Sequence, residues 1–341
     1  MAGAALVTGG TGFAGSHLVE HLLEHESSTG SGAPGIRIDA WSNPGGLAPS
    51  SSDPRVRWHA VNLLDREAVH STIAALAPST IYHCAGVADV NASRARPEKA
   101  LHVNALGTLH LLDAVWKAGL DCPVLVTGSA LIYRPSTDAI SEDAPLGPTN
   151  PYGVSKLAQE MVATQDRRRR TMVVRPFNHA GPRQSPAYVT SSFANQIAEI
   201  EAGKREPILS VGNLDAARDI TDVRDVVRAY PMIAERGEPG RPYNVCSGRA
   251  YRVGDLLERL LEMARVSVRV TVDPARLRPS DNPIVLGDRS RVTNEIGWEP
   301  VIPIERTLAD LLDYWRARTA RARIQMIGTG MCRRRAAART G

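Results

Sequence analysis

The sequence has few cysteines, few aromatic residues and no long apolar run. Its four cysteines, Cys84, Cys122, Cys246 and Cys332, are scattered without a CxxC or Cys/His spacing. That distribution indicates neither a zinc site nor a disulfide framework, so we expect reduced thiols and no metal. Aromatic residues make up 5% of the chain and are not interleaved with basic residues, so the usual signal of nucleic-acid binding is missing.

Apolar runs such as AALV and TMVV are strand length, whereas a membrane helix needs about 20 apolar residues. The first residues lead directly into a strand and a glycine turn, without the charged start, apolar stretch and cleavage site of a secretory signal. We therefore expect a cytoplasmic protein that does not span a membrane.

The net positive charge comes from one end of the chain. Residues 318–341 contain seven arginines and no acidic residue, so without them the net charge changes from +5 to −2. A body of that charge gives little reason to expect a nucleic-acid partner. We predict that 319–341 is a basic, disordered tail.

In the N-terminal half, short β-rich runs alternate with amphipathic helical runs. AALVT precedes SHLVEHLLEH, VRWHAVNL precedes REAVHSTIAALA, and TIYHCAG precedes ALHVNALGTLHLLDAVWKAG. This alternation predicts βαβ units, and hence an α/β fold with a Rossmann-type, doubly wound parallel sheet. We predict a dinucleotide-binding domain at 1–174 with returns around 218–246. Ranges 175–217 and 247–318 are predicted to form a smaller, interwoven C-terminal lobe that binds substrate.

GGTGFAG places Gly9, Gly12 and Gly15 after a predicted strand and at the start of a predicted helix. Glycine is needed where a turn adopts dihedrals closed to other residues and where a pyrophosphate approaches backbone N–H groups at a helix start. The loop therefore predicts a dinucleotide site. A tight turn without a ligand is the alternative.

The choice between NAD and NADP depends on the end of the second strand, where a carboxylate favours the ribose hydroxyls and an arginine favours a 2′-phosphate. Asp39 is a candidate carboxylate, but if the strand continues to Trp41, then Ser42 and Asn43 are at its edge. Arg37 is a candidate for that arginine, with a solvated strand residue as the alternative. The sequence leaves this choice open.

PYGVSK places Tyr152 and Lys156 four residues apart at the start of a helical run, so both project from one face. A free tyrosine has a pKa of about 10, and a neighbouring cation favours its phenolate. Ser129, which ends the strand VLVTGS, is placed to hydrogen-bond an oxygen that is being protonated. We predict that these three residues are catalytic.

From Ala4 to about Arg318 the chain resembles the extended short-chain dehydrogenase/reductases, most of which act on nucleotide sugars. The glycine loop and YxxxK carry the resemblance, together with HCAG at 83–86, NALGT at 104–108 and GSALIY at 128–133. It implies an NAD(P)-dependent oxidoreductase in which Lys156 also binds the nicotinamide ribose. The positions that match cofactor-binding residues are Gly9, Gly12, Phe13, Ala14, Gly15, Asn62, Leu63, Ala85, Gly86, Tyr152 and Lys156.

The C-terminal half looks like the GDP-mannose branch of this family. The similar segments are RPFNHAGPRQ, VGNLDAARDITDVRDVVRAY, YNVCSG, DPARLRPSDNP and GWEP. The resemblance implies a GDP-linked 6-deoxy-4-keto sugar as substrate. It assigns substrate contacts, including the diphosphate and a ribose, to Asn178, Val211, Asn213, Arg218, Arg278 and Asp281.

Within that branch, reductases and 4,6-dehydratases share cofactor, triad and nucleotide contacts. The dehydratases have an acidic residue two positions before the tyrosine of SxxxY, where this chain has Leu131 beside Ala130. Apolar residues cannot do the acid–base work of elimination. We therefore favour reduction of the C4 keto group to GDP-D-rhamnose, with a dehydratase, another nucleotide-sugar epimerase or reductase, and a noncatalytic NAD(P)-binding protein as alternatives.

Two departures from the branch pattern put the exact sugar in doubt. Arg134 follows Tyr133 where a glycine is usual, and HAGPRQ, with Arg183, replaces the commoner HIGPGQ. The resemblance also implies a homodimer that pairs ALHVNALGTLHLLDAVWKAG and YGVSKLAQEMVATQ in a four-helix bundle. Burial against the protomer's own sheet must account for part of their apolar faces.

Overall fold

A computed structural model describes residues 4–29, 37–47, 51–166, 169–277 and 282–337. The chain divides into two compact units. Unit 1 comprises 1–179, 219–250 and 284–301, and unit 2 comprises 180–218, 251–283 and 302–341.

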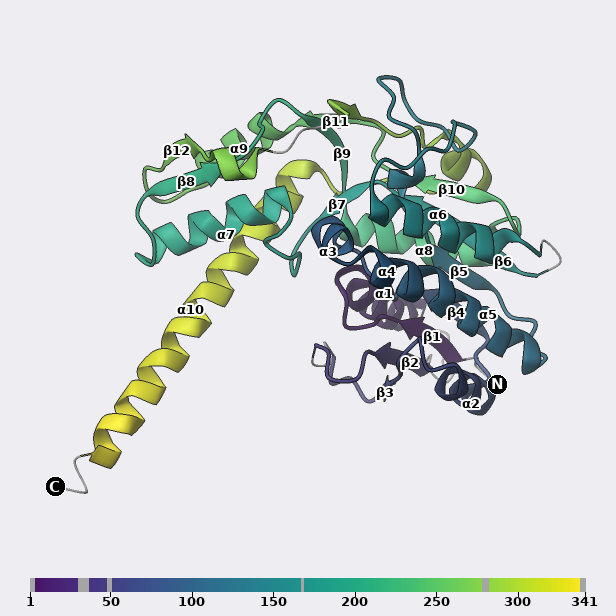
Figure 1. Ribbon diagram of the computed structural model, residues 1–341. Coiled ribbons are helices and arrows are strands. Elements are labelled where there is room, and N and C mark those ends of the chain that lie inside the picture. Colours follow the sequence, from purple (N-terminus) through teal and green to yellow (C-terminus); the bar gives the residue numbers. More distant parts are fainter. Residues whose placement is uncertain (1–3, 30–36, 48–50, 167–168, 278–281, 338–341) are drawn as a thin grey trace. The chain divides into compact units, whose positions relative to one another are not determined.

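Unit 1 is built on a seven-stranded sheet with the order β10-β6-β5-β4-β1-β2-β3, in which every neighbouring pair is parallel (Figure 1). This is the predicted Rossmann-type sheet. The strands are β1 (Ala4–Thr8), β2 (Arg37–Ser42), β3 (Val56–Ala60), β4 (Thr80–His83), β5 (Val124–Thr127), β6 (Thr171–Pro176) and β10 (Pro242–Val245).

Helices cover both faces of this sheet, which explains why the central strands are continuous apolar runs. All residues of β1 and β5 are buried. The helical segments of unit 1 are α1 (Phe13–Thr29), α2 (Arg66–Leu76), α3 (Val90–Ala95), α4 (Pro97–Leu101), η1 (His102–Leu106), α5 (Gly107–Lys117), η2 (Ala130–Ile132), α6 (Pro151–Thr164), α8 (Val223–Arg236) and η4 (Val292–Ile296).

The core of unit 1 has a separate cluster on each face of the sheet. One joins side chains of α1 and α8, such as Leu18 and Val226, to the sheet. The other includes Ile73 of α2 and Leu111 of α5. The C-terminal ends of the parallel strands meet at one edge of the sheet, where open α/β folds bind ligands.

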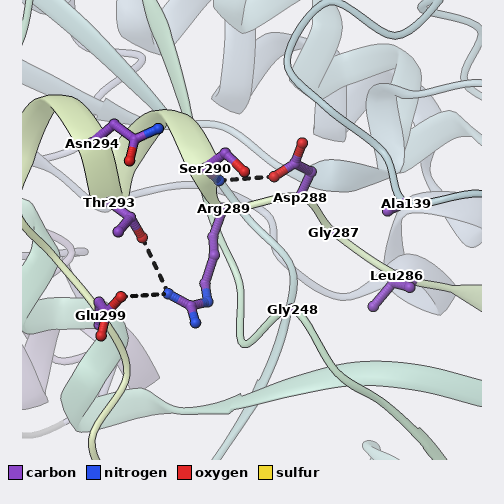
Figure 2. A pocket seen from close by; sticks show the side chains of 10 residues that line it. All are labelled: Ala139, Gly248, Leu286, Gly287, Asp288, Arg289, Ser290, Thr293, Asn294 and Glu299. Atoms are coloured by element: carbon purple, nitrogen blue, oxygen red, sulfur yellow. Dashed lines mark hydrogen bonds and ion pairs between the residues drawn. The ribbon is translucent and has the colours of Figure 1, made fainter.

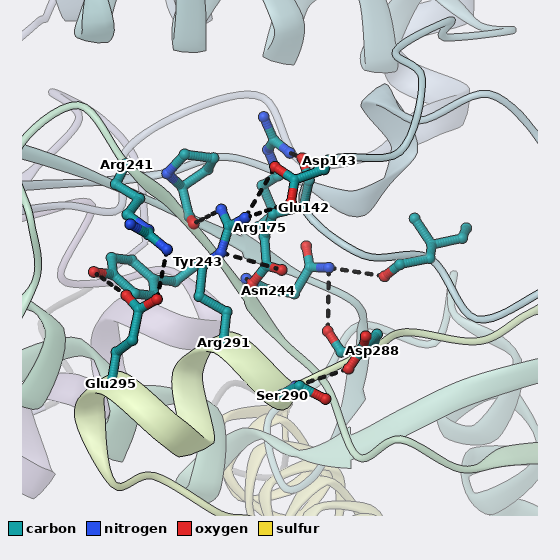
Figure 3. Close-up of polar contacts among 12 residues, drawn as sticks. Glu142, Asp143, Arg175, Arg241, Tyr243, Asn244, Asp288, Ser290, Arg291 and Glu295 are labelled. Atoms are coloured by element: carbon teal, nitrogen blue, oxygen red, sulfur yellow. Dashed lines mark hydrogen bonds and ion pairs between the residues drawn. The ribbon is translucent and has the colours of Figure 1, made fainter.

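A buried polar network connects the segment 284–301 to this sheet (Figure 3). Arg175 on β6 donates to the Tyr133 hydroxyl at 2.7 Å, and that hydroxyl donates to Asn244 Oδ1 at 2.7 Å. Asn244 N donates to Glu142 Oε1 at 2.8 Å, and Arg291 is 3.7 Å from Glu142 Oε2. The network anchors the stretch that follows Ser129, because Tyr133 lies at its centre.

Unit 2 contains α7 (Val189–Glu201), β8 (Ile208–Val211), α9 (Val253–Glu262), β12 (Arg269–Val272), η3 (Pro274–Arg276) and α10 (Ile304–Ala337). Strands β8 and β12 pair in parallel, and α7 packs against α9 and α10. A small sheet of β11 (Ala250–Arg252), β9 (Ala217–Asp222), β13 (Ile284–Val285) and β7 (Asn178–Ala180) contains points at which the chain passes from one unit to the other.

The observed division differs from the predicted domains in the assignment of 284–301. The sequence placed this range in the substrate lobe, whereas its contacts are with unit 1. The basic segment also differs, because α10 is helical to Ala337 where disorder was predicted from 319 onward. Arginine and alanine are strong helix formers, so this run extends a helix that begins within the fold. Residues 338–341 lie outside the described residues.

Within the described part of the chain, no helix is long and apolar enough to cross a membrane.

Candidate functional site

The glycine loop between β1 and α1 is too tightly packed to accept side chains. A Cβ at Gly15 would lie 2.1 Å from the Gly9 carbonyl oxygen, and a Cβ at Gly9 would lie 2.7 Å from the backbone of Ala85. Gly9 also has a φ of +68°. The absence of side chains leaves backbone at the start of a 17-residue helix open to close approach. This cradle fits the diphosphate of a nicotinamide dinucleotide.

The other predicted cofactor residues in unit 1 follow the C-terminal ends of neighbouring strands. Asn62 and Leu63 come after β3, and Ala85 and Gly86 come after β4. Ala85 N donates to Thr8 Oγ1 at 3.2 Å, which joins the ends of β4 and β1. The structure therefore gathers these positions at one edge of the sheet, where a dinucleotide would extend across it.

Ser129 follows β5 at the same edge. Its hydroxyl oxygen accepts a 3.1 Å hydrogen bond from Leu131 N and so begins the short helix η2. The side chain is buried, and the segment that follows it is held by the Tyr133 hydroxyl, which accepts from Arg175 and donates to Asn244. The hydroxyl is thus fixed in place by the turn that it caps.

Helix α6 starts in direct contact with η2. Asn150 caps it by accepting from Gly153 N at 2.9 Å, and Pro151 occupies the first helical turn. A Cβ at Gly153 would lie 2.3 Å from the Leu131 carbonyl oxygen. Only glycine permits this approach, and so Gly153 brings the start of α6, with Tyr152, against the segment that carries Ser129. Gly153 is not among the residues predicted from the sequence, although its place inside YxxxK is a local signal.

Tyr152 and Lys156 are both buried, on one face of α6. The Lys156 ammonium donates to the Thr127 carbonyl at 2.8 Å and to Gln159 Oε1 at 2.9 Å. Burial lowers the pKa of Lys156 to about 8. The lysine is therefore mostly charged at neutral pH and is held where the strand β5 ends.

Asn104 is a further polar residue of this region whose function the sequence did not reveal. Its amide Nδ2 donates to Ser155 Oγ at 2.8 Å, and its Oδ1 accepts from Val87 N at 2.7 Å. These contacts join η1 to α6 and to the loop after β4. The segment NALGT carried the signal as a family motif, but its hydrogen bonds depend on residues distant in sequence.

The end of β2 resolves the question about Asp39. β2 continues to Ser42, and Asp39 lies inside it, 1% exposed. Its carboxylate is 2.8 Å from His59 Nε2 and accepts from Arg37 Nε at 3.2 Å. Both partners bind the Asp39 carboxylate inside the strand, so the residues at the strand end are Ser42 and Asn43.

The predicted substrate residues are distributed over both units. Asn178 is exposed on β7 in unit 1, whereas Val211 is buried at the end of β8 in unit 2. Asn213 accepts from Asp215 N at 2.9 Å in a local turn. Arg218 donates to the carbonyls of Ala217 and Pro283, and burial lowers its pKa. Arg278 and Asp281 lie outside the described residues.

Unit 1 also contains a cavity of about 430 Å³ that none of the predicted site residues line (Figure 2). Its charged groups are satisfied internally, since Arg289 donates to Thr293 Oγ1 at 3.1 Å and to Glu299 at 3.2 Å. Asp288 accepts from Ser290 N at 2.8 Å. No group of three or more metal-ligating side chains occurs among the described residues.

A family model described as GDP-mannose 4,6 dehydratase matches residues 6–311. Among characterised relatives, the GDP-6-deoxy-D-mannose reductase of Pseudomonas aeruginosa is 35% identical over 318 residues, which cover 92% of this chain and 97% of that protein. The UDP-glucose 4-epimerase of Bacillus subtilis is 31% identical over 332 residues, covering 90% and 95% of the two chains.

Solved structures agree with this likeness. The structure of RMD from Pseudomonas aeruginosa with NADPH has a TM-score of 0.79 and 32% identity, and covers 93% of this chain and 99% of that one. The Thermus thermophilus UDP-glucose 4-epimerase complex with NAD has a TM-score of 0.79 and 27% identity, covering 92% and 99%. Both are similar to this chain over nearly its whole length.

Proposed function

Because the chain belongs to the extended short-chain dehydrogenase/reductases, in the GDP-mannose dehydratase/epimerase family of NAD(P)-dependent enzymes, we propose that it reduces GDP-4-dehydro-6-deoxy-D-mannose at C4 to GDP-D-rhamnose. One observation carries the proposal. The candidate site has a buried Tyr152 and Lys156, while η2 beside it supplies no ionisable side chain for an elimination.

The residues can supply the proton chemistry of this reaction. Tyr152 donates its phenolic proton to the keto oxygen as that oxygen becomes a hydroxyl, and the Ser129 hydroxyl hydrogen-bonds the same oxygen. The Lys156 ammonium stabilises the phenolate that Tyr152 leaves behind. When bound, the nicotinamide supplies the hydride that reduces C4.

The dehydratase reaction is disfavoured by the residues at the site. Removal of the C5 proton and departure of water from C6 require an additional base and acid. Leu131 occupies the position where the family's dehydratases have their acidic residue, and its neighbour Ala130 is apolar as well. The P. aeruginosa relative, a GDP-6-deoxy-D-mannose reductase, supports the same choice.

We further propose that NADPH is the preferred cofactor. A carboxylate at the end of β2 would favour NADH, and the only acidic residue of that strand, Asp39, is buried and bound to Arg37 and His59. Ser42 and Asn43 are neutral, so they leave room for a 2′-phosphate without charge repulsion. The related RMD structure contains NADPH.

For the nucleotide sugar, the contacts with Asn178, Val211, Asn213, Arg218, Arg278 and Asp281 stay proposals. Arginine guanidinium groups suit diphosphate oxygens because they bind them bidentately. The cytoplasmic location stays a prediction as well.

A homodimer is part of the proposal, because α4, η1, α5 and α6 expose apolar side chains along adjoining segments. The exposed residues are Leu101, Leu106, Leu109, Val154 and Met161. α4 and η1 both pack against α6. The opposite face of α5, with Leu111 and Ala114, is buried against the sheet, so only the exposed faces are available to a second copy.

An epimerase is the second candidate, because the B. subtilis UDP-glucose 4-epimerase is 31% identical and C4 epimerisation needs no acid or base beyond the triad. The test incubates the purified chain with GDP-4-dehydro-6-deoxy-D-mannose and NADPH and follows nicotinamide absorbance, with Tyr152→Phe as control. Stoichiometric oxidation that the control loses supports the reductase. If the wild type oxidises no NADPH and instead converts UDP-glucose to UDP-galactose, the chain is an epimerase.

A further inference from the structure

Lys156 is held by a side chain that the reaction scheme does not use. The lysine is 4% exposed, and its ammonium has two acceptors, the Thr127 carbonyl at 2.8 Å and Gln159 Oε1 at 2.9 Å. An ammonium has three N–H donors. One donor is thus left for the nicotinamide ribose, which the family resemblance assigns to this lysine.

The orientation of the Gln159 amide follows from its partners. Lysine has only donors, so the amide oxygen must face it. The amide Nε2 then donates to Thr108 Oγ1 at 2.9 Å. Thr108 can accept there, because its own hydroxyl proton goes to the Asn104 carbonyl at 2.6 Å. Gln159 is completely buried, and both ends of its amide are hydrogen-bonded.

The chain of hydrogen bonds continues through His83 to the glycine loop. His83 Nε2 is 2.8 Å from Thr108 Oγ1, so Nε2 carries the imidazole proton and donates it. Nδ1 is then bare and accepts from Thr8 Oγ1 at 2.8 Å. Thr8 is the last residue of β1, directly before Gly9. The lysine is thereby connected to the start of the cofactor cradle through four side chains in a row.

The ionisable groups near Lys156 are either uncharged at neutral pH or already paired with another residue. Burial, together with the charge of Lys156, lowers the pKa of His83 to about 3. Burial raises the pKa of the Cys84 thiol to about 12. Glu160, on the same helix, is bound to Arg175 of β6, with Arg175 Nε donating to Oε2 at 3.0 Å. Tyr152, one turn away on the same helix face, is the ionisable group of the proposed reaction on which the lysine's charge would act.

We propose that Gln159 is the positioning residue of Lys156, and that its amide fixes the ammonium while leaving its charge uncompensated for Tyr152. A carboxylate at this position would hold the lysine equally well but would neutralise it. An apolar side chain would leave the charge intact but would remove one of the two acceptors that a buried ammonium needs. The inference rests on the proposed function in that Lys156 stabilises the Tyr152 phenolate.

The test compares Gln159→Glu and Gln159→Met with a matched control, Gln196→Met, in the full chain. Gln196 is another buried helical glutamine, whose Oε1 accepts from Ser210 N at 3.0 Å. The measured quantity is the pH midpoint above which kcat for keto-sugar reduction falls. Melting temperatures of all variants report any general loss of stability.

Gln159→Glu is expected to move the midpoint up by about one pH unit, because the carboxylate raises the pKa of Lys156 and of Tyr152. Gln159→Met is expected to move it down by about one unit and to lower kcat about tenfold, with KM for the nucleotide sugar unchanged. Gln196→Met should leave the midpoint unchanged. Midpoints that stay fixed, or that move in the same direction for both Gln159 variants, would overturn the inference.

Two complications are covered by the design. If Gln159→Met does not fold, Gln159→Asn withdraws the amide from Lys156 and is expected to give the same downward shift. If the wild type does not reduce the keto sugar, the proposed function fails, and NADPH affinity is then measured against pH by nicotinamide fluorescence. The same opposite shifts for the Glu and Met variants are expected there, and coincident midpoints would refute the role of Gln159.

Discussion

The burial of Lys156 leads to a pH dependence that is expected for the proposed reaction. Its amine lies in a dry part of the molecule with neutral groups around it, and burial lowers its pKa to about 8. The charged form, which we propose stabilises the Tyr152 phenolate, therefore dominates only below that pH. The proposed proton donation depends on this charge.

We predict that kcat for reduction is nearly constant between pH 6 and about 7.5 and falls as pH rises through about 8, because Lys156 loses its proton there. The measurement is a pH–rate profile with saturating NADPH and nucleotide sugar. Rates that keep rising to pH 10 would contradict a lysine that must be charged.

Arg183 is a second residue whose conformation has a measurable consequence. It has a φ of +74°, in the left-handed region that favours glycine. The commoner family pattern has glycine at this position, so the chain keeps the turn and tolerates the strain of a side chain.

We expect Arg183→Gly to raise the free energy of unfolding by about 1 kcal/mol, because glycine adopts this φ without strain. Arg183→Ala is the control, since it removes the guanidinium but keeps the Cβ. Urea denaturation of the three proteins separates the two effects. A glycine variant no more stable than the alanine variant would show that the backbone conformation is not strained.

Among the elements, β2 would determine the environment of the adenosine ribose in the proposed cofactor site. Its register with β1 pairs Thr8 with Trp41, so the strand ends one residue later at Ser42. Gly10 N donates to the Trp41 carbonyl at 2.9 Å, which fixes this strand end against the glycine loop.

We predict that Ser42→Asp lowers the affinity for NADPH at least about tenfold and shifts the preference toward NADH, because a carboxylate repels the 2′-phosphate and binds ribose hydroxyls. Asp39→Asn is the matched control: it should destabilise the protein without changing the preference. Affinities from nicotinamide fluorescence test both. A wild type that prefers NADH would sink the NADPH proposal.

Local sequence patterns were sufficient to predict these elements. The environments of single residues depend on tertiary contacts and could not be predicted from those patterns. The strand, glycine loop and helix at 4–29 and the YxxxK segment are continuous in sequence, so their periodicity and spacing were sufficient. The sequence left open whether Asp39 contacts the cofactor ribose, because its partner His59 lies on a neighbouring strand. Gln159 gave no signal, since its burial depends on Thr108 of α5.

At the scale of the whole molecule, the largest difference from expectation is the segment 284–301. It follows a stretch of unit 2, and nothing in its composition indicates a return to unit 1. Its place there depends on contacts such as Arg291 with Glu142 and Trp298 Nε1 with the Asp225 carbonyl at 3.0 Å. Contacts of such sequence separation cannot be inferred from a single sequence without an alignment.

The exposed apolar faces of α4, η1, α5 and α6 lead to a prediction about assembly. We expect a dimer in solution, and we expect Leu106→Glu combined with Met161→Glu to give monomers, because charges would then be buried between the copies. Light scattering after size-exclusion chromatography measures the mass. Val301→Glu, at an exposed apolar residue outside these helices, should leave the mass unchanged. A monomeric wild type would exclude this surface as the dimer interface.

The most direct test of the central claim is the position of a transferred deuterium. GDP-4-dehydro-6-deoxy-D-mannose is incubated with NADPH carrying deuterium at the transferring position of its nicotinamide, and the sugar is examined by NMR. The account predicts one NADPH oxidised per sugar, deuterium bound to C4, and a rhamnose product. A keto sugar that is left unreduced in this sample would contradict the reductase. Conversion of GDP-mannose to the keto sugar in a parallel sample, without net NADPH consumption, would then indicate a dehydratase.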